Sequence, residues 1–148
     1  MVEWFDDLKI GMRFKSAAVT LSKDDIIRFA KEYDPQPFHL DDEAAKKTVF
    51  KGLAASGWHT AAIAMRLATE CQPFGPHPLL GAGVDELRWL KPVRPGDTLT
   101  GWVVCADKVP SRSRPTMGVI HEHWQVTNQN GELVMTTKGI NMVRRRPA

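Results

Sequence analysis

Apolar residues recur at helical spacing soon after residue 22 of the chain. Ser22 and Asp25 resemble a capping box, in which the two side chains satisfy free N–H groups at the start of a helix. The apolar positions that follow are Ile26, Ile27, Phe29, Ala30 and Tyr33. This spacing predicts a helix of about three turns. We expect it to end near Tyr33, because Asp34 precedes Pro35 and the residue before a proline is pushed out of the α region.

Two further helical segments follow. The stretch DDEAAKKTV, which starts at Asp41, has acidic residues in its first turn and lysines in its last, an arrangement that suits the helix dipole. From Ser56 the pattern predicts the main helix, with one face made of Trp58, Ala61, Ala62, Met65 and Ala68. Because the many alanines allow another backbone to approach closely, we expect a curved sheet to wrap around this helix.

The second half of the chain has the pattern of strands. Four stretches rich in β-branched and aromatic residues predict them: GVDELRWLKPV, DTLTGWVVCADKV, GVIHEHWQVTN and ELVMTTKGINMV. An earlier strand is expected from about Met12 to Thr20. The dipeptide Asn130-Gly131 favours a type I′ hairpin turn, so the last two strands should pair antiparallel. The order of elements predicts an α+β fold with one long helix against a mostly antiparallel sheet.

Length and composition indicate one globular domain, residues 1–148, because 43% of the residues are hydrophobic and 25% are charged. The N-terminal MVEWFDDLKIG has acidic residues where a signal peptide has basic ones. The apolar stretch LAASGWHTAAIAMRLA is interrupted by His59 and Arg66 and is too short to span a membrane. Cys71 and Cys105 match no metal spacing and predict reduced thiols. We therefore expect a cytoplasmic protein without a disulfide or a membrane span.

Positive charge is concentrated in a few places on a chain of formal net charge +3. Cations cluster at residues 112–114 (RSR), at residues 144–146 (RRR) and around residues 88–94. An anionic partner is expected, but nucleic acid is not, because aromatic and basic residues do not interleave on a strand. Arg112 and Arg114 lie in a loop between strands and are candidates for phosphate contacts, with a solvated loop as the alternative. We expect the RRR triplet to be a solvated tail.

The sequence YDPQPFHLDD, residues 33–42, places a carboxylate and an imidazole around two prolines. Pro35 and Pro37 restrict their own φ and the residue before each, so we expect a stiff, irregular segment rather than a helix. If it curls, Asp34 and His39 can hold one water as a general acid–base pair. The helix end before Asp34 should raise the pKa of its carboxyl, which suits a base. The alternative is that Asp34 only ends the helix and His39 only packs against its neighbours.

The sequence AASGWHT provides the outline of an oxyanion hole at the start of the main helix. Ser56 can cap the helix, and Gly57 lies in the first turn, where unpaired N–H groups point out of the helix end. Glycine has no side chain to block a carbonyl that approaches its N–H. A capping role for Ser56 and a packing role for Gly57 are compatible with this one.

The stretch FAKEYDPQPFHLDDEAAKKTVFKGLAASGWHT resembles the signature of the MaoC-like dehydratases and R-specific enoyl-CoA hydratases, which are hotdog-fold proteins. Their motif runs Gly-Asp-x-Asn-Pro-x-His, followed by a small or polar residue and a glycine at the start of the central helix. Asp34, Pro37 and His39 match this motif, and Ser56 and Gly57 match the helix start. The stretch WLKPVRPGDTL and the order of elements are also similar to the family.

The resemblance implies hydration of a 2-enoyl-CoA thioester or dehydration of a 3-hydroxyacyl-CoA. Asp34 and His39 would then handle the water and the protons, and the Gly57 amide would bind the thioester oxygen. Two positions depart from the motif, with Tyr33 in place of glycine and Gln36 in place of asparagine. Gln36 can still hydrogen-bond within the loop, although its extra methylene alters its reach.

The resemblance also carries expectations about ligands and assembly. It implies no cofactor, because CoA is part of the substrate, and a homodimer or a dimer of dimers, because hotdog sheets pair across a two-fold axis. We expect the substrate to contact Gln36, Pro37, Phe38, Ser56, Trp58, Arg112 and Arg114. Two alternatives remain open: a hotdog acyl-CoA thioesterase, and a non-catalytic subunit that binds acyl-CoA or a partner.

Two other clusters are weaker candidates for chemistry. His121 and His123 alternate on a strand and face one side, but no third ligand has a fitting spacing, so we expect no metal site. Ser56 and His59 are residue types that a serine hydrolase uses, but AASGW lacks the Gly-x-Ser-x-Gly elbow. We expect His59 to be a core or pocket-wall residue.

Overall fold

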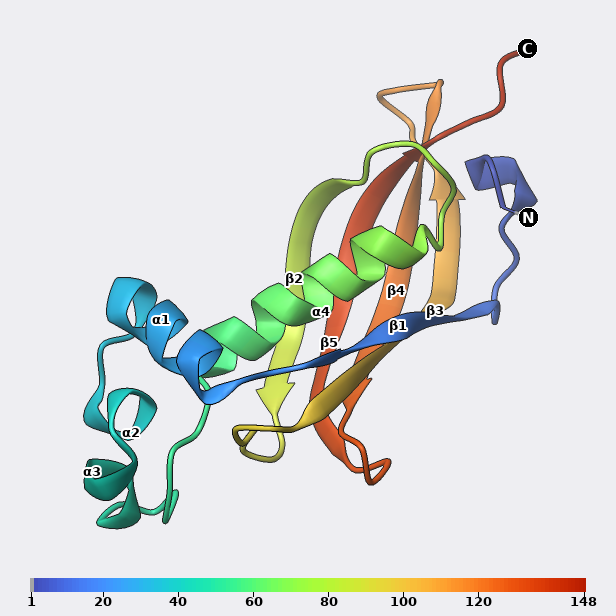
Figure 1. The fold of residues 1–148 in the computed structure, drawn as a ribbon. Coiled ribbons are helices and arrows are strands. Elements are labelled where there is room, and N and C mark those ends of the chain that lie inside the picture. The colour runs from blue at the N-terminus through green and yellow to red at the C-terminus, as the bar shows by residue number, and fades with distance from the viewer. Residues whose placement is uncertain (1) are drawn as a thin grey trace.

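In the computed structural model, which describes residues 2–148, a curved sheet wraps around one long helix (Figure 1). This helix, α4, spans Gly57–Cys71. The five strands are β1 (Arg13–Thr20), β2 (Leu80–Trp89), β3 (Thr98–Pro110), β4 (Met117–Thr127) and β5 (Leu133–Arg144). Their order in the sheet is β1-β3-β4-β5-β2, and every neighbouring pair is antiparallel. The expected strands and the α+β class are confirmed.

Shorter helices gather near the N-terminal end of α4 (Figure 1). They are α1 (Lys23–Tyr33), α2 (Pro37–Leu40) and α3 (Asp42–Lys46), and a 3-10 helix, η1 (Phe5–Asp7), lies near the N-terminus. The capping box of α1 is confirmed, since the Asp25 N–H donates to Ser22 Oγ at 3.0 Å. The expectation of an irregular segment at residues 33–42 is wrong, because α2 lies within it. Pro37 fits there as the first helical residue, where no N–H is needed.

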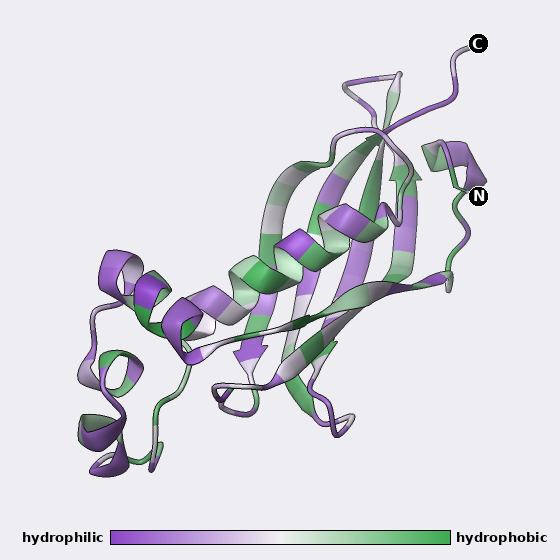
Figure 2. Ribbon diagram, in the orientation of Figure 1, coloured by the Kyte–Doolittle hydropathy of each residue, from purple (hydrophilic) through white to green (hydrophobic). Residues whose placement is uncertain are grey.

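The sheet curves where its strands change register. Such shifts occur in β1 after Lys15, in β2 after Asp85 and in β3 after Cys105. Extra residues at these bulges bend a strand and increase its twist, which lets the sheet close around a helix. Hydrophobic and hydrophilic residues alternate along the strands (Figure 2), and those on the inner face of β4 are buried: Gly118, Ile120, Glu122, Trp124 and Val126.

The face of α4 that packs on the sheet is not the one predicted. Its buried residues are His59, Thr60, Ala64, Leu67 and Ala68. Of the expected face only Ala68 is among them, whereas Trp58 and Met65 remain exposed. The helix is apolar on two sides, and periodicity does not say which side meets the sheet of its own chain.

The hairpin between β4 and β5 also differs from its prediction. The strands pair antiparallel as expected, but Asn130 does not have the positive φ of a type I′ turn, and only Gly131 does, at 73°. The Gly131 N–H donates to the Asn128 carbonyl at 3.0 Å, and the Asn128 N–H donates to the Glu132 carbonyl at 3.0 Å. A loop of three residues with glycine in the left-handed position therefore replaces the two-residue turn.

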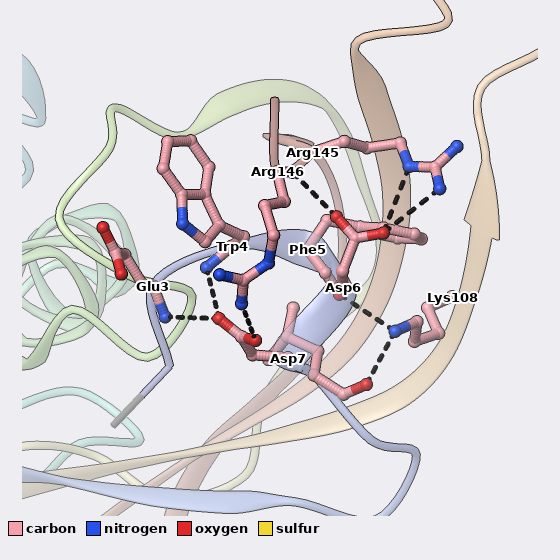
Figure 3. Close-up of polar contacts among 9 residues, drawn as sticks. Glu3, Trp4, Phe5, Asp6, Asp7, Lys108, Arg145 and Arg146 are labelled. Carbon is pink, nitrogen blue, oxygen red and sulfur yellow. Dashed lines mark hydrogen bonds and ion pairs between the residues drawn. The ribbon is translucent and has the colours of Figure 1, made fainter. Parts of the chain in front are cut away.

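The C-terminal arginines are not a solvated tail. Figure 3 shows Arg145 on the Asp6 carboxylate, at 3.1 Å, and Arg146 on the Asp7 carboxylate, at 2.6 Å. Lys108 Nζ donates to the carbonyls of Phe5, at 2.9 Å, and of Leu8, at 2.6 Å. The acidic residues of η1 supplied the partners that the sequence pattern did not reveal. Residues 5–8 and 145–146 are thereby joined at the end of the sheet opposite to α1 (Figure 1).

Candidate active site

The segment after α1 curls back on itself. Asp34 caps the C-terminal end of α1, and its N–H donates to the Ala30 carbonyl at 3.0 Å. The Gln36 N–H then donates to the Asp34 carbonyl at 2.8 Å, which makes a tight turn around Pro35. Pro37 begins α2 directly afterwards. The two prolines therefore bring the residues on either side of them together.

Asp34 and His39 are in direct contact. His39 Nε2 lies 3.2 Å from Asp34 Oδ2, and the two side chains are only 6% and 16% exposed. His39 Nδ1 lies 2.7 Å from the Ala54 carbonyl oxygen. Because a carbonyl only accepts, Nδ1 carries a proton, and Nε2 is the nitrogen that faces Asp34. The Phe38 ring packs edge-on against the His39 ring, with centroids 4.6 Å apart. His39 therefore both packs against its neighbour and pairs with Asp34.

The Asp34 carboxylate is surrounded by donors. Ser56 Oγ donates to Oδ2 and Gln36 Nε2 to Oδ1, each at 2.6 Å. Burial alone would raise the pKa of Asp34, but these two hydrogen bonds and the proximity of His39 together hold it below its ordinary value of 3.8. The expected increase in pKa is therefore wrong, because nearby donors outweigh the end of one helix. At neutral pH this carboxyl is an anion.

The N-terminus of α4 lies beside this carboxylate. Ser56 Oγ accepts from the Trp58 N–H at 3.3 Å while its own O–H is donated to Asp34, so this side chain caps α4 and connects it to the acid–base pair. Within residues 2–148, no hydrogen bond of the Gly57 N–H is found. The structure thus brings Asp34, His39, Ser56 and an open Gly57 N–H into one place.

A tryptophan pair flanks Gly57. The rings of Trp58 and Trp89 meet at nearly a right angle, with centroids 5.2 Å apart. Trp89 is the last residue of β2, and its indole lies against Gly57. The sequence analysis did not find Trp89, because its separation of 32 positions from Gly57 gives no periodic signal.

The irregular segment that leads into α4 is clamped by Arg94. Its guanidinium donates to the carbonyls of Gly52 at 2.8 Å and of Leu53 at 3.3 Å, and also to that of Phe50. The Leu53 N–H donates to Asp42 Oδ1 at 2.9 Å. The sequence analysis counted Arg94 only as part of a basic cluster, and no local pattern distinguishes it from its neighbours. Arg94 fixes the segment that precedes α4 and does not belong to the acid–base pair.

Other candidate residues lie elsewhere. Arg112 and Arg114 are exposed in the loop between β3 and β4, at the end of the sheet opposite to α1 and α2 (Figure 1). His121 and His123 are exposed on β4, and among the described residues no group of three His, Cys, Asp or Glu could hold a metal ion. His59 is buried and stacks on Phe29 at 4.6 Å, and burial lowers its pKa.

Residues 7–126 match the model of the MaoC-like domain. The chain belongs to the MaoC-like family. Its sheet around one central helix is the hotdog fold, as the sequence predicted. Asp34, His39 and Gly57, on which the resemblance in sequence rests, lie within the matched residues.

The chain is similar to several proteins of known sequence or structure. An uncharacterized protein of Bacillus subtilis, YdeM, is 42% identical over 73% of this chain and 77% of its own length. An (R)-specific enoyl-CoA hydratase of Rhodospirillum rubrum is 32% identical over 76% of each chain. The crystal structure of a MaoC-like dehydratase from R. rubrum superposes with a TM-score of 0.90 at 44% identity, covering 98% of this chain and 99% of the other.

None of the helices within residues 2–148 combines the length and the apolar character needed to cross a lipid bilayer.

Proposed function

We propose that this MaoC-like protein adds water to a 2-enoyl-CoA thioester, or removes it from a 3-hydroxyacyl-CoA. The observation that carries this proposal is the buried contact of 3.2 Å between His39 Nε2 and Asp34 Oδ2, next to the open N–H of Gly57. Hydration needs a base for water, a proton for C2 and a donor for the developing oxyanion. The (R)-specific enoyl-CoA hydratase among the relatives supports the same reaction class.

In the proposed reaction, a water molecule bound by Asp34 and His39 attacks C3 of the enoyl group. The water loses one proton to the pair, its hydroxyl forms the C3–O bond, and the electrons of the double bond move toward the thioester oxygen. The Gly57 N–H stabilises that oxygen. The pair then delivers a proton to C2, which completes the addition.

The remaining candidate residues have supporting roles in this proposal. Ser56 and Gln36 hold Asp34 through hydrogen bonds of 2.6 Å, so Gln36 performs the positioning expected of it despite its extra methylene. Pro37, Phe38 and Trp58 are proposed to line the acyl thioester, and the reaction needs no cofactor beyond the CoA of the substrate. The cytoplasmic location expected from the sequence stays a prediction.

We also propose that the chain forms a homodimer or a dimer of dimers. β2 ends the sheet and pairs only with β5, so one of its edges is open. Away from the site, large apolar side chains are exposed on α4 and β2, namely Met65, Leu80 and Val84. A second copy would cover both features. Light scattering after size-exclusion chromatography checks this, and a mass of one chain would contradict it.

The test of the reaction uses crotonyl-CoA. Purified protein should remove the absorbance of the conjugated thioester without releasing free thiol, and His39→Ala should abolish this signal. Release of free thiol would identify a thioesterase instead. Binding of crotonyl-CoA with neither signal would identify a non-catalytic acyl-CoA-binding subunit. A panel of enoyl-CoA chain lengths would then define the preferred acyl group.

A further inference from the structure

The indole of Trp89 occupies the space that a side chain on residue 57 would fill. A Cβ atom built on Gly57 would lie 2.5 Å from Trp89 Cε2, 2.6 Å from Cδ2 and 2.8 Å from Nε1, and real Cβ contacts do not fall below 3.0 Å. All three atoms belong to the five-membered ring of the indole, so Gly57 faces the broad side of this ring. Only glycine at position 57 allows the indole to lie there.

Trp89 is held in this position from both directions. At its backbone it pairs with Met135 of β5, and the next N–H, of Leu90, donates to the Val134 carbonyl at 2.9 Å. The Trp89 ring contacts the ring of Trp58, and the backbone N–H of Trp58 donates to Ser56 Oγ. Even so, Trp89 is 45% exposed and Trp58 is 59% exposed. Two large aromatic rings thus stand at an open surface beside the helix end.

We propose that Trp89 forms one wall of the thioester site and is a positioning residue for the reaction. This inference rests on the proposed function, because it assigns the ligand at Gly57 as an acyl thioester. With the indole on one side of Gly57, a thioester oxygen reaches the N–H only from the side of Asp34 and His39.

The wall has a physical consequence for the N–H group itself. A hydrogen bond to a developing oxyanion is worth more where water is excluded, because the local dielectric constant is lower. An aromatic ring excludes water from the Gly57 N–H without competing for it, since its face carries no strong acceptor. Trp89 therefore strengthens the hydrogen bond that the Gly57 N–H donates and directs the thioester carbonyl toward this N–H.

The first test is a double-mutant cycle on crotonyl-CoA hydration with Gly57→Ala, Trp89→Ala and the double variant. In wild type the added methyl displaces the indole, so Gly57→Ala should lower kcat by up to about 10²-fold, as expected for a misplaced reacting group. In the Trp89→Ala background the same methyl meets open space and should cost much less. Trp89→Phe should retain most of the activity, whereas a purely structural role would appear in the melting temperature alone.

The second test measures binding and does not depend on turnover. In His39→Ala protein, crotonyl-CoA should quench tryptophan fluorescence, and adding Trp89→Phe should remove most of that quenching. The matched control is Trp102→Phe, because Trp102 lies on β3 under the Arg13 guanidinium, 4.1 Å away, and outside the site. In the His39→Ala background the control should preserve the quenching, and in the wild-type background Trp102→Phe should preserve hydration.

The outcomes separate the two proposals. Additive costs of Gly57→Ala and Trp89→Ala, together with unchanged quenching in Trp89→Phe, would overturn the role of Trp89 while hydration by wild type stands. Quenching that depends on Trp89, in a protein that never hydrates crotonyl-CoA, would support the wall and reject the hydratase.

Discussion

The carboxylate of Asp34 is contacted by three side chains, from Gln36, His39 and Ser56. The two prolines between Asp34 and His39 limited the conformers that connect them, and a close pair was one of the two alternatives that the sequence left open. The direction of the pKa shift was not predictable. It depends on the hydroxyl of Ser56, which lies 22 positions away and reaches Asp34 only in the folded chain.

Asp34→Asn and His39→Ala should each lower the turnover of crotonyl-CoA by at least about 10²-fold, the loss expected for a general acid or base. Because its pKa lies below 3.8, Asp34 stays ionised as the pH falls from 7 toward 4, so its protonation should not limit turnover in that range. Steady-state kinetics measure both effects. His121→Ala, at an exposed position on β4, is the control, and turnover of the first two variants equal to this control would remove the pair from the mechanism.

A second buried carboxyl, Glu122, has an unusual environment. Its side chain is fully buried on the inner face of β4, against Gly139, and it accepts a hydrogen bond from Asn141. Burial raises the pKa of Glu122 from 4.5 to about 7, and the Asn141 hydrogen bond only partly offsets this. The folded state therefore binds this proton more tightly than the unfolded state does.

Glu122→Gln should make the free energy of unfolding less dependent on pH. With a folded-state pKa of about 7, Glu122 favours folding most below pH 4.5 and loses that contribution as the pH rises through 7. The loss amounts to about 3 kcal/mol above pH 7. Urea unfolding at pH 5 and pH 8 measures it, with the exposed Glu32→Gln as control. Equal pH dependence in wild type and Glu122→Gln would contradict the assignment.

At the scale of elements, caps and strand composition predicted most of the fold. The capping box at Ser22 and the β-branched stretches located α1 and the sheet, because both signals are local. The buried face of α4 and the turn before Gly131 were predicted wrongly. The buried face depends on which apolar side of α4 meets the sheet. The turn depends on whether two or three residues connect β4 to β5. Local sequence determines neither.

Arg94→Lys should destabilise the segment that leads into α4. A lysine cannot serve the carbonyls of Phe50, Gly52 and Leu53 at once, because it lacks the planar fork of the guanidinium. We expect a loss of about 1–3 kcal/mol, the cost of partly buried groups left unsatisfied. Urea unfolding measures this. Arg88→Lys is the matched control, since Arg88 is exposed, and an equal effect of both substitutions would reject the clamp.

At the scale of the whole molecule, the candidate active site and the loop that carries Arg112 and Arg114 lie at opposite ends of the sheet (Figure 1). Within one chain, Arg112 and Arg114 are far from Gly57 along the sheet (Figure 1). Their predicted contact with the phosphates of CoA therefore requires a second copy, placed so that its loop between β3 and β4 approaches α4. The sequence pattern identified suitable cations but could not place them relative to the site.

Mixed assemblies test whether these arginines act across copies. His39→Ala and Arg112→Ala/Arg114→Ala chains should each be impaired alone, the second mainly through a higher KM for CoA thioesters. In a mixed dimer, one site combines an intact His39 with intact arginines from the other chain, so part of the wild-type kcat/KM should return. A mixture no better than the sum of its parts would place the arginines outside the site.

The amide protons of residues 53–55 should exchange slowly with solvent, although these residues belong to no helix or strand. Each has a fixed acceptor: Leu53 on Asp42 at 2.9 Å, Ala54 on the Phe38 carbonyl at 3.2 Å, and Ala55 on the Val93 carbonyl at 2.9 Å. Hydrogen–deuterium exchange followed by mass spectrometry should find them protected like the sheet, and rapid exchange would contradict this. If residues 53–55 are already ordered in the free protein, they lose little conformational entropy when a ligand binds. More of the energy of their contacts then contributes to the affinity for the ligand.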